Sequence, residues 1–345
     1  MRAYLQRIAT GPHMSKDLTA DEVEDAMELI LSGFAEPVQA AVFFIALRMK
    51  RETEDENAGA LRALRARTGA ARADVDNLVE LGDPHDGFAR HLPASPFLPA
   101  VLAECGLPAL SHGCRELPPK RGVTVHRVLA AAGIAVDMTP ADAAVRIADP
   151  DLGWAYVDVA QSCPPLHRLV ALRDQIVKRP LLSTLEKLMG PVRGRRNHLV
   201  VGFVHTGYDD LLASMARVAG YDSMLAIKGL EGGVIPSLTS TSNALGFRAT
   251  GVPLTAPIDP AAVGIEAAER AAPIPDGVTG LDAIAALAAQ VGIAALEGAR
   301  GLTREALVHA GSAILAHVGA APNRPAAAAR IRAALDDGSA RARFR

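Results

Sequence analysis

The chain has 345 residues, of which 50% are apolar and 21% charged, with 30 Gly and 23 Pro. At roughly 150 residues per domain this length predicts two domains or one large one, and the composition excludes collagen-like, disordered and small disulfide-stapled proteins. The formal net charge of −2 gives no bulk electrostatic attraction to DNA or a membrane, although a local basic groove stays open. The three cysteines lack CxxC spacing, and no signal-peptide-like or membrane-spanning apolar run is present. We therefore expect a cytoplasmic protein without a membrane partner.

The N-terminal part predicts three consecutive helices. Thr19 and Glu22 form a capping-box pattern before an apolar-periodic helix that Gly33 closes. Residues 37–50 predict a second helix that is apolar on most sides, as in a helix buried between neighbours or in a subunit interface. Residues 52–67 predict a third, more polar helix. With no strand between them, these helices predict a small all-helical N-terminal domain.

From residue 78 onward, strand-like and helical stretches alternate. Short apolar runs at 107–113, 153–160, 198–205 and 223–229 are strand-like, and residues 95–106, 123–133 and 208–220 are helical in pattern. This alternation predicts an α/β fold in which helices flank a mainly parallel central sheet.

Two further stretches complete the expected organisation. Residues 164–189 are helical again and are expected to pack back on the N-terminal helices. Residues 261–345 are expected to be mostly helix, with loops at 251–260 and 272–277. The predicted domains are 1–72 plus about 164–190, and 73–163 plus 191–345.

Several long runs occur together in one order along the chain: LTADEVEDAMELILSGFAEPVQAAVFFIALRMKRETEDENAG, ECGLPALSHGCR, LVVGFVHTGYDDLLASMARVAGYDSMLAIKG, REALVHAGSAIL and RAALDDGSARARF. They resemble anthranilate phosphoribosyltransferase and its relatives in glycosyltransferase family 3 over nearly the whole chain. The resemblance implies a small helical domain and a larger α/β domain. It also implies an interdomain cleft for phosphoribosyl pyrophosphate and an aromatic acceptor, and a homodimer formed through the helical domain.

The resemblance places the family's glycine-rich phosphate cradle, GTGGDG, on residues 82–87, where Pro84 and His85 replace two glycines. Proline removes an N–H donor, and Asp83 puts negative charge beside the anion, so we do not expect this cradle to hold pyrophosphate in the family's way. A plain surface turn is the alternative interpretation. Of the family's next motif, NIST, the chain keeps only Ser95.

Two other family motifs are altered. The KHGNR loop falls on residues 111–115, where Ser111 replaces the phosphate-binding lysine and Cys114 replaces the asparagine that faces the acceptor. The Asp-Glu pair that holds Mg²⁺ in the family falls on Val234 and Ile235. The sequence therefore leaves open whether Mg²⁺ binds without this Asp-Glu pair. Glu231, the carboxylate nearby, is expected to have a structural or capping role rather than to bind metal.

The segment from Cys163 to Arg179 aligns without a gap with the family's HPAMK…R…GIRT stretch. Arg173 falls on the arginine that contacts the acceptor carboxylate in the family, but an ion pair with Asp174 or Glu186 is the alternative. The ligand-binding residues implied by the resemblance are Gly82, Asp86, Gly87, Ser95, His112, Gly113, Arg115, Arg173 and Arg179, and no catalytic residue is assigned.

The stretch from Arg168 to Arg196 holds eight Lys or Arg against Asp174 and Glu186, a local balance of +6. Such a segment can bind a polyanion, although solvated surface charge is the commoner explanation of a basic run. The candidate polyanion-binding residues are Lys120, Arg121, Arg168, Lys178, Lys187, Arg193, Arg195 and Arg196.

Two hypotheses follow from different classes of protein. In the first, a diverged pentosyl or phosphoribosyl transferase binds a ribosyl phosphate or a similar anion in the cleft, without being a genuine anthranilate phosphoribosyltransferase; whether it turns over substrate is left open. In the second, a non-catalytic TrpD-like homodimer binds single-stranded nucleic acid through a basic interdomain groove, with steep salt dependence.

Overall fold

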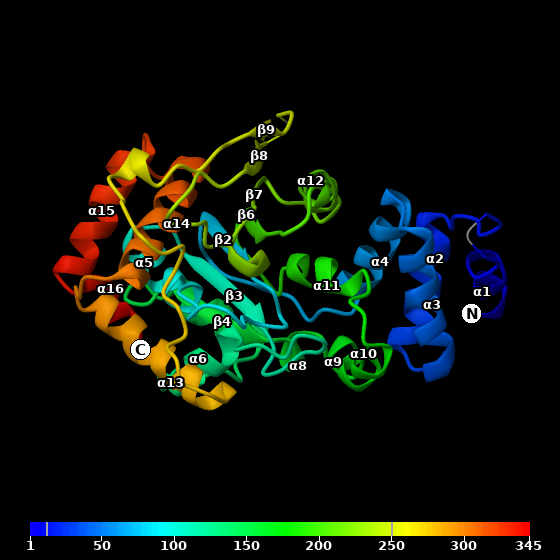
Figure 1. Ribbon diagram of the computed structural model, residues 1–345. Helices are drawn as coiled ribbons and strands as arrows, with labels where there is room; N and C mark the ends of the chain where they lie inside the picture. Colours follow the sequence, from blue (N-terminus) through cyan, green and yellow to red (C-terminus); the bar gives the residue numbers. More distant parts are fainter. Residues whose placement is uncertain (12, 250) are drawn as a thin grey trace.

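A helical part and an α/β part lie side by side in the computed structural model, which describes residues 1–11, 13–249 and 251–345 (Figure 1). The helical part contains α1 (Arg2–Ile8), α2 (Ala20–Leu31), α3 (Pro37–Lys50) and α4 (Glu54–Ala66). The predicted capping box is present: the Thr19 side chain accepts from the Glu22 amide, and the Glu22 carboxylate accepts from the Thr19 amide. The three expected helices are thus confirmed, and α1 is an addition.

The central sheet has seven strands in the order β4-β3-β2-β6-β7-β8-β9. Its strands are β2 (Asn77–Gly82), β3 (Ala109–Gly113), β4 (Trp154–Asp158), β6 (Arg196–Gly202), β7 (Ser223–Ile227), β8 (Ala244–Arg248) and β9 (Leu254–Thr255). All pairings from β4 to β7 are parallel, whereas β8 and β9 are antiparallel. A mainly parallel sheet is therefore confirmed. A separate two-stranded sheet joins β1 (Ala71–Arg72) to β5 (Val192–Arg193).

The expected loop over residues 251–260 is wrong in part, because it contains β9. Leu254 and Thr255 pair with Gly246 and Leu245 of β8. The flanking Pro and Gly residues hide this short strand from sequence patterns. Pairing with β8 stabilises the strand, whereas local propensity does not.

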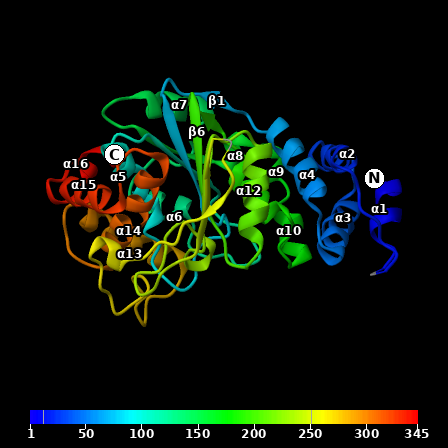
Figure 2. The ribbon, with the colours of Figure 1, turned by 90° about the horizontal axis from the view of Figure 1, so that it is seen from above.

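Helices cover both faces of the sheet (Figure 2). One face carries α5 (Leu98–Glu104, after η1, Ser95–Phe97), α6 (Val125–Ala131), α13 (Leu281–Leu296), α14 (Leu302–Val318), α15 (Arg324–Asp336) and α16 (Ser339–Arg343). The other face carries α12 (Tyr208–Val218) and the segment that leads to the helical part. The remaining elements are α7 (Pro140–Ala148), α8 (Val159–Ser162), α9 (Pro164–His167), α10 (Val170–Ile176), α11 (Leu182–Leu185), η2 (Glu186–Leu188), η3 (Leu230–Gly232) and η4 (Ala261–Val263).

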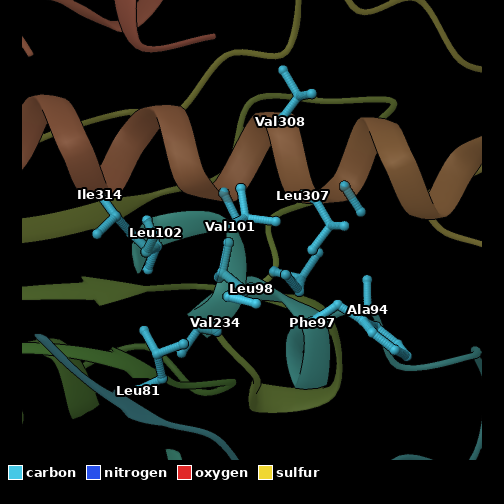
Figure 3. Packing of buried hydrophobic residues seen from close by; sticks show 14 of the residues in the cluster. Leu81, Ala94, Phe97, Leu98, Val101, Leu102, Val234, Leu307, Val308 and Ile314 are labelled. Atoms are coloured by element: carbon cyan, nitrogen blue, oxygen red, sulfur yellow. The ribbon is translucent and has the colours of Figure 1, made fainter. Parts of the chain in front are cut away.

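The core divides along the alternation of the buried strands. In β6, Val200 packs into the cluster on the α14 face, and its neighbours Leu199 and Val201 pack into the cluster on the α12 face. Figure 3 shows side chains of α5 meeting Leu307 and Ile314 of α14 in the first cluster. The parallel strands β2, β3, β4, β6 and β7 are thus largely buried on both faces, and their connecting loops emerge where the strands end.

Residues 164–189 return to the helical part, as expected. Helix α10 contacts α3, and α11 contacts α4. Leu166, Leu182 and Leu185 are buried in the same cluster as Phe43 and Phe44 of α3. This packing supports the division into 1–72 plus about 164–190 and 73–163 plus 191–345, which we retain as a proposal. Within the described ranges, no helix is long and apolar enough to cross a bilayer.

Candidate functional site

The candidate site lies at the carboxyl edge of the parallel strands. Because β2, β3, β6 and β7 run in one direction, the loops that follow them, residues 83–92, 114–122, 203–207 and 228–233, emerge at the same edge. In open α/β sheets this edge is where ligands bind. The expected residues Asp86, Gly87 and Arg115 lie on these loops, and Gly82, His112 and Gly113 end their strands.

The loop that replaces the glycine-rich cradle is a packed turn. Gly87 has φ +77°, and a Cβ added there would come within 2.6 Å of the Gly122 carbonyl carbon. The Gly122 amide donates to the Asp86 carbonyl over 2.8 Å. The Asp83 carboxylate is buried and accepts the Val234 amide over 3.0 Å, and burial raises the pKa of Asp83. The Asp83 carboxylate and the Asp86 carbonyl of this turn are thus already bonded to backbone amides of the protein.

His112 belongs to a buried network centred on Glu80, which sequence reasoning missed. Glu80 Oε1 and His112 Nε2 share a hydrogen bond of 2.8 Å, and the Tyr221 hydroxyl and the Gly190 amide donate to the same carboxylate over 2.5 and 3.1 Å. Burial raises the pKa of Glu80, but its hydrogen bonds and the nearby His112 outweigh burial and lower it. The missed signal is the lone charge inside the otherwise apolar strand β2.

A second group missed from the sequence closes the end of β4. Asp158 Oδ2 lies 3.0 Å from His126 Nδ1, and both side chains are largely buried. Asp158 also accepts the Ala160 amide over 2.7 Å and so caps α8. An aspartate that directly ends a buried strand is the signal that could have drawn attention to it.

Arg173 forms a buried ion pair with Glu186, one of the two alternatives left open by the sequence. Its side chain is 2% exposed, and Nη2 donates to Glu186 Oε1 over 3.1 Å and to Ser183 Oγ over 3.0 Å. Nη1 donates to Glu186 Oε2. Both terminal nitrogens of the guanidinium are therefore engaged within the protein. His85 lies against this pair, and burial lowers its pKa well below the ordinary histidine value.

Ion pairs join α10 and the segment that follows it to the loops of the edge. Arg179 Nε donates to Asp86 Oδ2 over 2.8 Å. Arg121 Nη2 lies 2.8 Å from Asp174 Oδ1, and Lys120 Nζ lies 3.6 Å from Asp86 Oδ1. Ser95, the remaining expected ligand residue, is buried at the start of η1.

Most side chains of the basic stretch are engaged by acidic groups or backbone carbonyls of the protein. Arg195 lies between Asp74 and Asp76, 2.7 Å from each, and Arg168 donates to the Leu31 carbonyl over 3.0 Å. Lys187 is buried and donates to the Gly202 carbonyl over 2.9 Å, and burial lowers its pKa to about 8.

The arginines near β6 also lie away from the candidate site. Arg193 stacks over the Tyr221 ring at 4.4 Å, and Arg196 begins β6. Together with Arg195 they are at the amino edge of the sheet, opposite the loops described above. Within the described part of the stretch, only Lys178 and Arg196 have exposed side chains without a hydrogen-bonding or acidic partner.

The residues present do not fit the family's magnesium site. Val234 and Ile235, which fall on the Asp-Glu pair, are 0% and 5% exposed and pack into the core. Glu231 accepts the amides of Ala89 and Arg90, each over 2.9 Å. The described residues contain no group of three or more His, Cys, Asp or Glu side chains placed to hold a metal.

Comparison with known proteins agrees with this architecture. Residues 2–68 match the profile of the glycosyl transferase family, helical bundle domain. An uncharacterized protein of Aquifex aeolicus is 28% identical over 221 residues, 64% of this chain and 65% of that protein. Anthranilate phosphoribosyltransferase of Rhodopseudomonas palustris strain HaA2 is 28% identical over 347 residues, covering 100% of this chain and 96% of the relative.

Solved structures show the same fold. The crystal structure of anthranilate phosphoribosyltransferase (TrpD) from Thermus thermophilus superposes with a TM-score of 0.78 at 20% identity, covering 100% of this chain and 97% of that one. The Saccharomyces cerevisiae enzyme in complex with PRPP and Mg gives 0.75 at 13% identity, with 99% and 95% covered. Residues 2–68 thus carry the helical bundle domain of the glycosyl transferase family. Over its whole length the chain is TrpD-like: it is similar in sequence to anthranilate phosphoribosyltransferase and has the same fold.

Proposed function

We propose that the protein binds a ribosyl-phosphate-type anion at the carboxyl edge of its sheet and is not a genuine anthranilate phosphoribosyltransferase. The observation that carries this proposal is a set of unneutralised cations. Arg90, Arg115 and Lys228 are exposed on loops of this edge, and no side-chain partner is found for them among the residues described. Free cations at one edge attract an anion, and a guanidinium can hold phosphate through two parallel hydrogen bonds.

The departure from anthranilate phosphoribosyltransferase rests on two losses. The guanidinium of Arg173 is committed to Glu186, so it offers no free fork to the carboxylate of an acceptor. Val234 and Ile235 supply no oxygen ligands for the ion that would neutralise a pyrophosphate leaving group.

The nucleic-acid alternative has less support. It requires several free cations in one groove, whereas Arg195 is paired with two aspartates and Lys187 is buried. Arg193, Arg195 and Arg196 also lie at the amino edge of the sheet, opposite the loops of the candidate site.

Arg115→Ala is expected to weaken binding of ribose 5-phosphate at least about tenfold, because it removes a charge-assisted phosphate contact. Calorimetric titration of the purified protein measures the change. The matched control is Arg195→Ala, which removes another exposed arginine from the opposite edge and should leave the affinity unchanged. Equal loss in both variants, or none in either, would contradict the proposed location.

Two copies of the chain are proposed to associate through the helical part. A groove of about 530 Å³ between α1 and α3 is lined largely by apolar side chains, among them Ile8, Val42, Ile45 and Met49. Met49 is 76% exposed, and Phe34, which precedes α3, is 83% exposed. An apolar groove with exposed apolar side chains marks an interaction site, and the family resemblance favours a second copy as the occupant.

Val42→Glu is expected to convert a dimer into a monomer, because it places a charge among the apolar side chains that line this groove. Sedimentation velocity measures the mass of both forms. Val145→Glu changes an exposed valine on α7, outside the groove, and should leave the mass unchanged. A wild-type protein that sediments as a monomer would overturn this assembly.

A further inference from the structure

Glu231 is held in an unusual local conformation. Its φ of 52° lies in the left-handed region, which is uncommon for a residue other than glycine. Its side chain is 8% exposed, and the carboxylate spans two consecutive amides: Oε2 accepts from Ala89 and Oε1 from Arg90, each over 2.9 Å. A strained backbone thus directs one carboxylate onto a pair of neighbouring N–H groups.

Two basic side chains complete the surroundings of this carboxylate. His91 Nδ1 lies 3.4 Å from Oε1, and Lys120 Nζ lies 3.7 Å from Oε2. Burial raises the pKa of Glu231, but hydrogen bonds from His91 and from the two amides outweigh it and lower the pKa to about 2. The other carboxylate nearby, Asp86, pairs with Arg179 and also lies 3.6 Å from Lys120 Nζ. Successive amides with a lysine and a histidine are the groups with which proteins bind phosphate.

We infer that the amides of Ala89 and Arg90, with His91 and Lys120, form a subsite for a phosphate-class anion, and that the Glu231 carboxylate occupies it as a built-in competitor. A phosphoryl group that reaches these amides must displace the side chain. The inference rests on the proposed function, since it assigns one part of the anion-binding edge. It makes Glu231 the residue that sets how tightly that edge holds phosphate.

The two amides are fixed independently of Glu231. The Phe88 amide donates to the Val123 carbonyl over 2.9 Å, and the Leu92 amide donates to the Ala272 carbonyl over 2.9 Å. Both ends of the short segment are therefore anchored by backbone bonds, and we expect the N–H groups to stay in place when the carboxylate is removed.

The loop that carries Glu231 is also self-supporting. The Gly233 amide donates to the Leu230 carbonyl over 2.9 Å, and the Leu230 amide donates to the Ile235 carbonyl over 2.8 Å. Replacing Glu231 by glycine, which adopts positive φ readily, suits this backbone and vacates the subsite.

Glu231→Gly is expected to bind inorganic phosphate at least about tenfold more tightly than the wild-type chain, because the internal competitor is gone. Calorimetry gives the affinities. In ¹H–¹⁵N spectra the amides of Ala89 and Arg90 should shift with phosphate in the variant and stay unshifted in the wild type. Glu231→Gln, which keeps the shape and loses the charge, should give an intermediate affinity.

Glu116→Gln is the matched control, since this carboxylate pairs with Arg121 and Arg127 on a neighbouring loop and should not alter phosphate affinity. The inference is overturned if folded Glu231→Gly and Glu231→Gln variants bind phosphate no more tightly than the wild type, or if the shifts fall on other amides. Ribose 5-phosphate, titrated into the wild type, tests the proposed function separately. If the wild type does not bind ribose 5-phosphate but Glu231→Gly binds phosphate more tightly, the proposed function is rejected and the phosphate subsite is retained.

Discussion

Glu186→Ala is expected to lower the free energy of unfolding by about 3–5 kcal/mol, because it leaves the buried Arg173 guanidinium without its counter-ion. Arg173 is 2% exposed and has no route to water without opening the segment between α10 and η2. Chemical denaturation followed by circular dichroism measures the change. This expected loss is large because a charge stranded in the interior costs far more than the intact pair contributes.

The Arg173→Met/Glu186→Leu double variant should recover most of the lost stability, since apolar residues of similar size often replace a buried ion pair without cost. Glu297→Ala is the matched control: its carboxylate lies 3.2 Å from Arg341 on the surface, where an ion pair contributes about 0–1 kcal/mol. A Glu186→Ala variant as stable as this control would mean that Arg173 is free to bind a ligand after all.

Glu80→Ala is expected to cost about 3 kcal/mol or more, because it strands three buried donors that each lose about 1–3 kcal/mol. These are the ring of His112, the Tyr221 hydroxyl and the Gly190 amide. Tyr221→Phe, which removes one donor and leaves the carboxylate with two, should cost about 1 kcal/mol. Urea denaturation of the two variants gives the comparison.

The contribution of Glu80 should also depend on pH. The folded state lowers the pKa of Glu80, so its contribution is fully present above the unfolded carboxyl pKa of about 4.3 and is lost as the pH falls through the folded value. The stability difference between wild type and Glu80→Gln should therefore shrink in acid. A difference that stays constant down to pH values well below about 4 would contradict the network.

The order of elements follows closely from sequence patterns, because periodicity and capping are local properties. The Thr19 capping box and the alternating runs around β3, β4, β6 and β7 predicted the helical part and a mainly parallel sheet correctly. β9 was missed because its pairing with β8 is a long-range effect that Pro and Gly neighbours conceal.

The candidate site was less predictable because charge pairing is a tertiary property. Sequence placed Arg173 against either a ligand or one of the acids Asp174 and Glu186 without choosing. Packing brings Glu186 to it across the short helix α11. The +6 balance of residues 168–196 counted Arg195 as free, although Asp74 and Asp76 come from a distant stretch. Glu231 was given a capping role, and its partners at residues 89 and 90 lie far away in the chain.

The central claim is that the carboxyl edge binds a sugar phosphate and that the basic stretch is not a nucleic-acid surface. The most direct test is calorimetric titration of the wild-type protein with phosphoribosyl pyrophosphate, with and without Mg²⁺, beside a short single-stranded oligonucleotide at two salt concentrations. We expect saturable sugar-phosphate binding that does not require Mg²⁺, and little oligonucleotide binding. Steeply salt-dependent oligonucleotide binding without any response to the sugar phosphate would contradict the account.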